Sequence, residues 1–184
     1  MRLTAYSDLL IATINAHIRA DRPQLNSGVR LPPRMLHHTN ASTPDLLAQW
    51  RWLLGGLPRL IGWSSAGDLF YLDESARCCR LDTGAGEVEV VASSRDAFDS
   101  ALEDPKRTDE LFLSPVVREF ESVHGPLPAG CCLGFRTLPV HGGAYAVENR
   151  FVISVAEHAS ITGDLHRQIR ALPDGTALRL KIVP

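Results

Sequence analysis

Four short segments between residues 60 and 92 constrain the fold of this chain more than any other feature. Each is rich in β-forming residues and alternates between apolar and polar positions, as half-buried strands do. The segments are Leu60–Ser64, Asp68–Leu72, Arg77–Leu81 and Glu87–Ala92. The turns between them are only a few residues long, whereas parallel strands need long crossover connections. The sequence therefore predicts an antiparallel meander.

Helical patterns flank the predicted meander. Apolar residues at helical spacing indicate a helix over 9–18, and Thr43 followed by Pro44 predicts a second helix that ends at Gly55-Gly56. The Pro-rich stretch 23–44 is expected to form an irregular connection. After the meander, helices are expected over 94–102, 114–123 and 160–171, with strands over 131–136, 150–155 and 178–183.

These elements predict an α+β fold, in which an antiparallel sheet meander with packed helices is followed by a smaller α+β C-terminal module. We expect an N-terminal helical segment with an irregular loop over 1–56, a sheet region over 57–123 and the C-terminal module over 124–184. A chain of 184 residues can bury one sizeable core, so the three regions are expected to form one compact unit.

The composition and the N-terminal sequence indicate a cytoplasmic protein. Hydrophobic residues make up 45% of the chain and charged residues 22%, which is ordinary for a globular domain. The first 20 residues lack the basic head, apolar run and cleavage site of a secretory signal. No segment approaches the roughly 20 uninterrupted apolar residues that cross a bilayer. We therefore expect no membrane association.

The four cysteines occur as two adjacent pairs, Cys78-Cys79 and Cys131-Cys132. Neighbouring residues on a strand point to opposite faces, so one member of each pair is expected to face the core and the other to face out. Buried free thiols are favoured in a reducing cytoplasm, although an inter-strand disulfide between the pairs is geometrically feasible. Neither pair has the spacing of zinc ligands.

No motif in the chain points to catalysis or to a cofactor. The phosphate-binding G-x-x-x-x-G-K-[ST] pattern and the dinucleotide-binding G-x-G-x-x-G pattern do not occur. Ser64 lies in a sequence that approaches a nucleophile elbow but lacks its closing glycine. A thiol–imidazole pair of Cys131 or Cys132 with His141 has no visible third group. We therefore expect no catalytic, metal-binding or cofactor-binding residue.

The net charge of −2 hides an uneven distribution of charge along the chain. Residues 1–67 contain 7 basic and 3 acidic side chains, residues 68–121 contain 6 and 14, and residues 122–184 contain 6 and 4, which gives +4, −8 and +2. An ordinary solvated surface explains such an acidic segment, but a negative face also steers and docks a basic partner. The small net charge argues against direct nucleic-acid binding.

Carboxylates at the turns of the predicted meander are the candidates for such a partner surface. Binding residues concentrate on loops, and unpaired carboxylates are rarely buried, so we expect these side chains to be exposed. The candidates are Asp73, Glu74, Asp82 and Glu87.

The last 60 or so residues contain a series of short motifs in a definite order. They are Cys132-Leu133-Gly134-Phe135-Arg136, Gly142-Gly143, Glu148-Asn149, His158 to Gln168, and Leu172 to Thr176. In order, spacing and length the series resembles the C-terminal domain of type VI secretion DNase-immunity proteins, with Leu133 where that family usually has an aromatic residue. Upstream, Gly67 to Leu72 and the turn at Asp82-Thr83-Gly84 resemble the end of the GAD-like domain that precedes this module in the family. Residues 57–123 are accordingly identified as a partial GAD-like region and residues 124–184 as an immunity-type module.

The motif residues are expected to have structural roles. Gly142-Gly143 is expected to take positive φ angles in the loop after the strand at Phe135. Ile161, Leu165 and Ile169 are expected to form an apolar stripe that packs on the sheet. The family-motif residues assigned to structure are Gly134, Phe135, Gly142, Gly143, Ile161, Leu165 and His166.

The resemblance implies a bacterial immunity protein, not an enzyme, that binds and neutralises a cognate toxin, with a secreted nuclease as the expected toxin. A homodimer is left open as a further assembly. Two other functions stay open at this point. A small hydrolase would use Ser64 or a Cys–His pair together with an acid in one pocket. A regulatory or scaffold module that binds nucleic acid or a cell-envelope partner would carry a basic groove.

Overall fold

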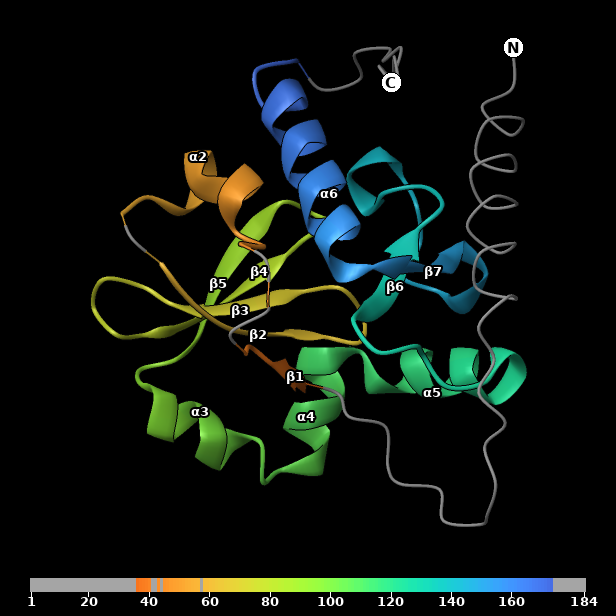
Figure 1. Ribbon diagram of the computed structural model, residues 1–184, viewed down its shortest axis with the longest axis horizontal. Coiled ribbons are helices and arrows are strands. Elements are labelled where there is room, and N and C mark those ends of the chain that lie inside the picture. Colours follow the sequence, from red (N-terminus) through yellow and green to blue (C-terminus); the bar gives the residue numbers. More distant parts are fainter. Residues whose placement is uncertain (1–35, 41–42, 44, 57, 174–184) are drawn as a thin grey trace.

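The centre of the protein is a five-stranded antiparallel sheet with the strand order β1-β2-β3-β4-β5 (Figure 1). The computed structural model describes residues 36–40, 43, 45–56 and 58–173. The strands are β1 (Leu36–His38), β2 (Arg59–Ser64), β3 (Leu69–Leu72), β4 (Cys78–Asp82) and β5 (Glu87–Ala92). The predicted α+β fold is confirmed, and β2 to β5 are the predicted meander in consecutive order.

Strand β1 corrects the expectation of an irregular connection up to residue 44. Leu36, His37 and His38 pair with Ser64, Trp63 and Gly62 of β2. Three residues after two prolines are too few to display an alternating pattern, so only the pairing with β2 identifies them as a strand.

The remaining elements lie before and after the sheet. They are η1 (Ala48–Trp50), α2 (Arg51–Leu54), α3 (Arg95–Ala101), α4 (Pro105–Phe112), α5 (Ser114–His124), β6 (Cys131–Phe135), η2 (Pro139–His141), η3 (Val147–Asn149), β7 (Arg150–Ser154) and α6 (Val155–Ile169). Strands β6 and β7 form a separate antiparallel pair. The helix predicted over 9–18, the strand predicted over 178–183 and Pro44 lie outside the described residues.

Two helical predictions need correction. The helix expected to start at Thr43 begins instead as a turn of 3-10 helix at Ala48, and the hydroxyl of Thr43 accepts a hydrogen bond from the amide of Asn40. Helix α4 was not predicted, because most of its residues are polar and only its last turn is apolar. Its start nevertheless follows the rule for helix N-termini, since Asp104 caps the amide of Lys106 and proline follows the cap.

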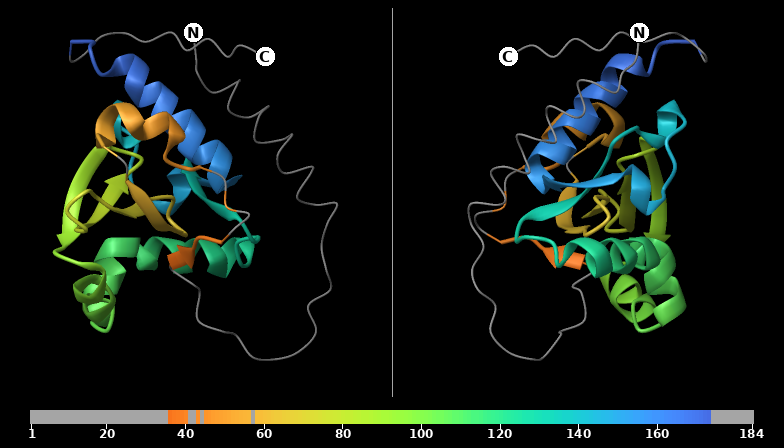
Figure 2. Two further views of the ribbon diagram at one scale, coloured as in Figure 1. Left: turned by 60° about the vertical axis from the view of Figure 1, so that its left-hand side comes forward. Right: turned by 90° about the vertical axis from the view of Figure 1, so that its right-hand side faces the viewer.

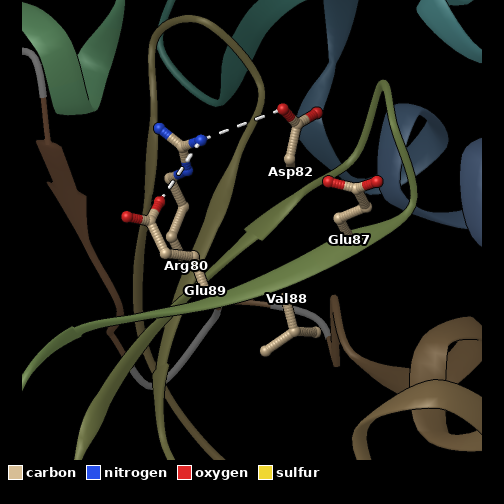
Figure 3. A pocket seen from close by; sticks show the side chains of 5 residues that line it. All are labelled: Arg80, Asp82, Glu87, Val88 and Glu89. Carbon is tan, nitrogen blue, oxygen red and sulfur yellow. Dashed lines mark ion pairs between the residues drawn. The ribbon is translucent and has the colours of Figure 1, made fainter.

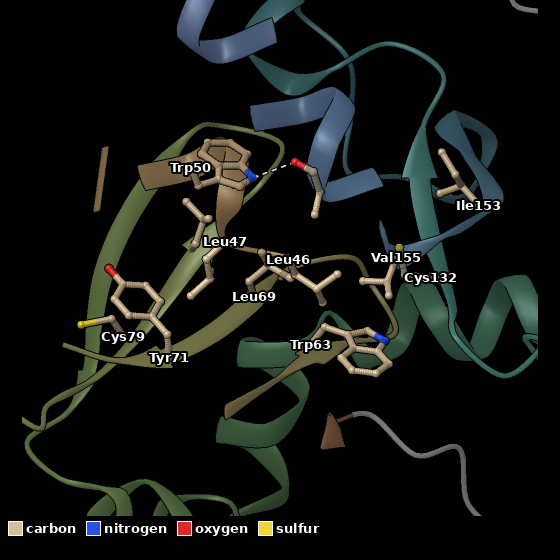
Figure 4. Packing of buried hydrophobic residues seen from close by; sticks show 12 residues of the cluster. Leu46, Leu47, Trp50, Trp63, Leu69, Tyr71, Cys79, Cys132, Ile153 and Val155 are labelled. Atoms are coloured by element: carbon tan, nitrogen blue, oxygen red, sulfur yellow. Dashed lines mark hydrogen bonds between the residues drawn. The ribbon is translucent and has the colours of Figure 1, made fainter. Parts of the chain in front are cut away.

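Helices and the β6–β7 unit cover the sheet on its two faces (Figure 2). One face packs against α3 and α4, with Phe70 of β3 in contact with the rings of Phe98 and Phe112. The other face packs against η1, α6 and the β6–β7 pair, with Trp50 and Tyr71 in its core (Figure 4). The sheet is therefore the middle layer of the molecule.

The covering of both faces corrects one expectation about the cysteines. Cys78 and Cys79 are both buried, because Cys78 points into the core under α3 and Cys79 into the core under η1. The second pair follows the expectation, since Cys132 is buried and Cys131 is half-buried. All four are free thiols.

Helix α6 packs on the molecule through a face other than the predicted apolar stripe. Its buried residues are Val155, His158, Ala159, Thr162, Gly163 and His166. Ile161 of the predicted stripe is 53% exposed, and Leu165 and Ile169 are only half-buried. Small residues face η1 because the two elements are close: a Cβ atom on Gly163 would lie 2.8 Å from the Cβ of Gln49.

The motif glycines have separate structural reasons. Gly142 has a φ of 85° and ends η2, as expected, whereas Gly143 does not take a positive φ. A side chain on Gly143 would collide with the backbone carbonyl of Thr137. A Cβ on Gly134 would lie 2.9 Å from Cγ2 of Ile153 on the paired strand β7. Gly143 and Gly134 are therefore needed for close approach rather than for backbone conformation.

Candidate functional site

The turn between β4 and β5 joins the sheet to the β6–β7 unit. Asp82, the last residue of β4, accepts hydrogen bonds from the backbone amides of Gly84 and Ala85 at 2.9 Å each. The hydroxyl of Tyr145 donates to the two carboxylate oxygens of Asp82 at 3.0 and 2.8 Å. The side chain of Asp82 is only 15% exposed, so the expectation that this carboxylate is exposed is wrong. The turn amides and Tyr145 satisfy this carboxylate in place of water.

Two histidines of α6 contact the same turn. The Oγ1 atom of Thr83 lies 2.8 Å from Nε2 of His158, and Nε2 of His166 lies 3.2 Å from the backbone oxygen of Thr83. The ring of His166 also packs 5.4 Å from that of Trp50. All three side chains at Thr83, His158 and His166 are buried. These contacts attach α6 to the turn and leave no room for a substrate between hydroxyl and imidazole.

Arg150 is a buried cation at the centre of this junction. Its Nη1 atom donates to the backbone oxygens of Ala66 and Leu133 at 3.2 Å each. The guanidinium lies 3.7 Å from the ring centroid of Phe135, which adds a cation–π contact. Burial lowers the pKa of Arg150 to about 10, so the side chain stays charged at neutral pH.

Asp68 lies buried beside the same charged groups. Its Oδ1 atom accepts a hydrogen bond from the amide of Thr83 at 3.4 Å. Burial, together with the negative charge of Asp82, raises the pKa of Asp68 to about 7. Burial and the positive charge of Arg150 lower the pKa of His158 to about 4. Asp68 and His158 are therefore both largely uncharged between about pH 4 and pH 7, which suits a junction closed to water.

An open concavity of about 330 Å³ lies on the surface of the β4–β5 hairpin (Figure 3). It is lined by Arg80, Asp82, Glu87, Val88 and Glu89. The guanidinium of Arg80 lies 3.6 Å from a carboxylate oxygen of Glu89 and 3.9 Å from one of Asp82. The lining holds three carboxylates and one arginine, so it carries a net charge of −2. Glu87 and Glu89 are exposed, and their charges face solvent.

The four predicted partner-binding residues fall at opposite ends of β4. Asp82 and Glu87 are paired across the hairpin at one end. Asp73 and Glu74 lie in the β3–β4 turn at the other end, next to the Leu72–Cys78 pair. Four residues of strand separate these ends by about 14 Å. The structure therefore brings Asp82 together with Glu87, but not with the other two.

Asp73 is half-buried, with a side chain that is 19% exposed, so the expectation that it is exposed is wrong as well. It has a local structural role. Its carboxylate accepts hydrogen bonds from the amides of Ser75 and Arg77 and pairs with the Arg77 side chain. Glu74 is exposed in the same turn. The sequence analysis missed Arg80 and Glu89, which line the concavity with Asp82 and Glu87. Arg80 lies two residues before Asp82 on β4, so the two side chains share a face. Glu89 of β5 pairs with Arg80 and therefore lies on that face as well.

The residues considered for catalysis do not converge. Ser64 is fully buried, and its Oγ atom accepts a hydrogen bond from the amide of Asp68 at 3.0 Å. Cys132 is fully buried in the core under α6, and burial raises the pKa of its thiol. His141 is exposed on η2. Among the residues that the structure describes, no group of three or more His, Cys, Asp or Glu side chains is placed to hold a metal ion.

A known protein family matches the C-terminal part of the described residues. Residues 92–166 match the family model described as T6SS immunity protein Tdi1, C-terminal. The matched region begins at the last residue of β5, includes α3 to β7 and ends in α6 at His166. The matched family consists of type VI secretion immunity proteins, which confirms the resemblance of the C-terminal motifs to such proteins. The GAD-like resemblance of the region upstream stays a prediction.

A solved structure shares the fold. The crystal structure of Atu4351 from Agrobacterium tumefaciens matches with a TM-score of 0.50 and 18% sequence identity, over 65% of this chain and 63% of that chain. The present chain thus spans less than two thirds of that protein. No curated protein sequence matches significantly. None of the helices in the described part of the chain is both long and apolar enough to span a membrane.

Proposed function

We propose that this protein protects the cell that makes it by binding a cognate type VI secretion toxin and blocking that toxin, without catalysis of its own. The observation that carries the proposal is the match of residues 92–166 to the Tdi1 C-terminal family. The buried states of Ser64 and Cys132 support a binding role, because neither side chain can reach a substrate. The hydrolase alternative required Ser64, or a pair of Cys131 or Cys132 with His141, to meet an acid in one pocket.

The acidic β4–β5 surface supports a nuclease as the toxin. A nuclease presents a basic cleft to its phosphate-rich substrate, and a negatively charged protein surface can bind in that cleft in place of the substrate. Asp82, Glu87 and Glu89 provide that charge around the concavity, with Arg80 as the single cation. We place the toxin-binding surface here, with Glu74 at the far end of the hairpin as an outlying contributor.

The experiment uses the purified protein and the toxin encoded by the neighbouring gene. An equimolar amount of the protein is expected to stop the toxin from degrading plasmid DNA, and the two proteins are expected to elute together in size-exclusion chromatography. The protein alone should not degrade DNA. Plasmid degradation that continues in the presence of a stable complex would contradict neutralisation, and the absence of a complex would contradict the binding role.

Charge reversal tests the surface. Glu87→Lys with Glu89→Lys is expected to slow association with the toxin by about tenfold or more at low salt and to reduce its salt dependence, because long-range attraction is lost. The control matched in charge is Glu103→Lys with Glu119→Lys, two exposed carboxylates of which one lies between α3 and α4 and the other on α5. Stopped-flow association rates at several salt concentrations give the answer. Equal slowing by the control would show that only net charge matters.

A further inference from the structure

Strand β5 is the last strand of the sheet, and its outer edge is open. Among the described residues it pairs only with β4, from the Cys78–Ala92 pair to the Asp82–Glu87 pair (Figure 1). Val91 and Ala92 are partly covered by the core under α3. The four residues Glu87–Val90 are all exposed. They present unpaired backbone groups along about 13 Å of strand.

The side chains of this open stretch alternate between apolar and acidic. Val88 and Val90, 41% and 48% exposed, lie opposite Leu81 and Cys79 and share their face of the sheet. Neither valine belongs to the hydrophobic core on that face. Glu87 and Glu89 lie on the other face. Residues 87–90 include no lysine and no proline, the residues that most often protect an edge strand from pairing. Their only charged side chains are the two glutamates.

We propose that the toxin adds a strand to the outer edge of β5, and that this strand alternates basic with β-branched or other apolar residues. The inference rests on the proposed toxin-binding function and specifies how the partner binds. Main-chain hydrogen bonds along Glu87–Val90 provide the attachment, and the side chains on each face select the sequence of the added strand. Basic residues of the added strand lie beside Glu87 and Glu89, and apolar residues lie beside Val88 and Val90.

Charge decides between this partner and a second copy of the chain. In an antiparallel pair, residues directly opposite each other share a face. Two β5 strands paired in this way would place Glu87 and Glu89 of one copy against the same carboxylates of the other, on a face that already holds Asp82. Like charges directly opposite each other are destabilising, whereas a lysine or arginine in that position is stabilising. The edge thus selects against a homodimer and in favour of a basic strand.

Hydrogen exchange of the backbone amides tests the proposal on the wild-type chain. Amide exchange in residues 87–90 is measured by mass spectrometry, alone and in complex with the toxin encoded by the neighbouring gene. About tenfold or greater slowing in this stretch is expected on binding, because the added strand supplies partners for its open amides. A stable complex in which residues 87–90 exchange unchanged, while other segments slow, would overturn the strand addition but leave the proposed function intact.

Two other outcomes would also overturn the proposal. No complex with the toxin would remove the proposed function and this inference together. Slowing at residues 87–90 that appears without toxin and grows with protein concentration would identify a second copy as the partner.

A variant separates strand addition from simple charge attraction. Val88→Thr with Val90→Thr removes the apolar contacts with the added strand without changing the charge, and both side chains are exposed and stay β-branched, so the fold should be retained. The expected result is a toxin Kd raised at least about tenfold, with an unchanged thermal midpoint. The matched control is Val123→Thr with Val140→Thr, at two valines outside the sheet that are 71% and 45% exposed. Unchanged affinity of the double variant would contradict the inference.

Discussion

Asp68 and His158 illustrate at the scale of single residues how the buried junction handles charge. Burial raises the pKa of Asp68 to about 7 and lowers that of His158 to about 4. Between pH 4 and 6.5 the folded protein holds a proton on Asp68 that the unfolded chain has released. Over the same range the unfolded chain binds a proton on its histidine that folded His158 does not. The two effects on proton binding are opposite, so their contributions to the pH dependence of stability cancel.

Removing one partner should expose the effect of the other. In Asp68→Asn only His158 remains, and the unfolded state then binds more protons, so the free energy of unfolding relative to wild type should rise with pH from 4 to 6.5. In His158→Gln the difference should fall as pH rises over the same range. The slopes should approach about 1.4 kcal/mol per pH unit. Urea unfolding at pH 4.5, 5.5 and 6.5 measures them, and parallel curves for all three proteins would contradict the prediction.

At the scale of elements, α6 shows that close approach can matter more than apolar side chains. The Nε1 atoms of Trp50 and Trp52 donate to the backbone oxygens of Ala159 and Gly163, at 3.0 and 3.3 Å. These bonds require the backbone of α6 to lie against η1 and α2. A helix face with bulky aliphatic residues would hold the elements apart, so the predicted stripe at Ile161 turns outward.

Gly163→Ala tests this close packing. Alanine favours a helix interior over glycine by about 1 kcal/mol, so an uncrowded site would be stabilised. Here the new Cβ would lie 2.8 to 3.0 Å from atoms of Gln49, including backbone atoms, which must move. We expect a net loss of about 1 kcal/mol or more in the free energy of unfolding, because overpacking costs about 1–3 kcal/mol. Ser160→Ala, exposed on the same helix, is the control and should stabilise slightly; stabilisation by both substitutions would show that the contact is loose.

At the scale of the whole molecule, the region that matches the Tdi1 C-terminal family depends on the sheet that precedes it. The amide of Leu133 on β6 donates to the backbone oxygen of Ser65, and Arg150 on β7 donates to that of Ala66. Cys132, Ile153 and Val155 lie in one core with residues of β2, β3 and β4. Cutting the chain at the start of the family match would expose this core and leave Arg150 without one of its acceptors.

We therefore expect a fragment of residues 92–184 not to fold alone, whereas the whole chain unfolds in one cooperative transition. Circular dichroism of the fragment should resemble an unfolded chain, because its largest hydrophobic cluster has lost its partner layer. For the whole chain, far-ultraviolet circular dichroism and tryptophan fluorescence should give the same denaturant midpoint. A folded fragment or two separate midpoints would identify the C-terminal part as an independent domain.

Local sequence signals determined the elements whose residues interact mainly with near neighbours. Alternation and short turns predicted β2 to β5, and the cap at Ser94 predicted α3. The motif series after Cys131 predicted the family, because order and spacing along the chain need no contacts to be recognised. The expected absence of a catalytic centre and the place of the toxin-binding surface stay predictions.

Tertiary structure decided the features that depend on which segments meet. Asp82 is mostly buried because Tyr145, 63 residues later, donates to its carboxylate. Helix α6 turns His158 and His166 inward because the β4–β5 turn offers them hydrogen-bond partners. Burial of a polar residue depends on partners that are distant in sequence, whereas periodicity reports only the apolar faces of single elements. The sequence by itself thus determined strands β2 to β5 and the resemblance to an immunity family, and the packing of the layers determined which charges remain on the surface.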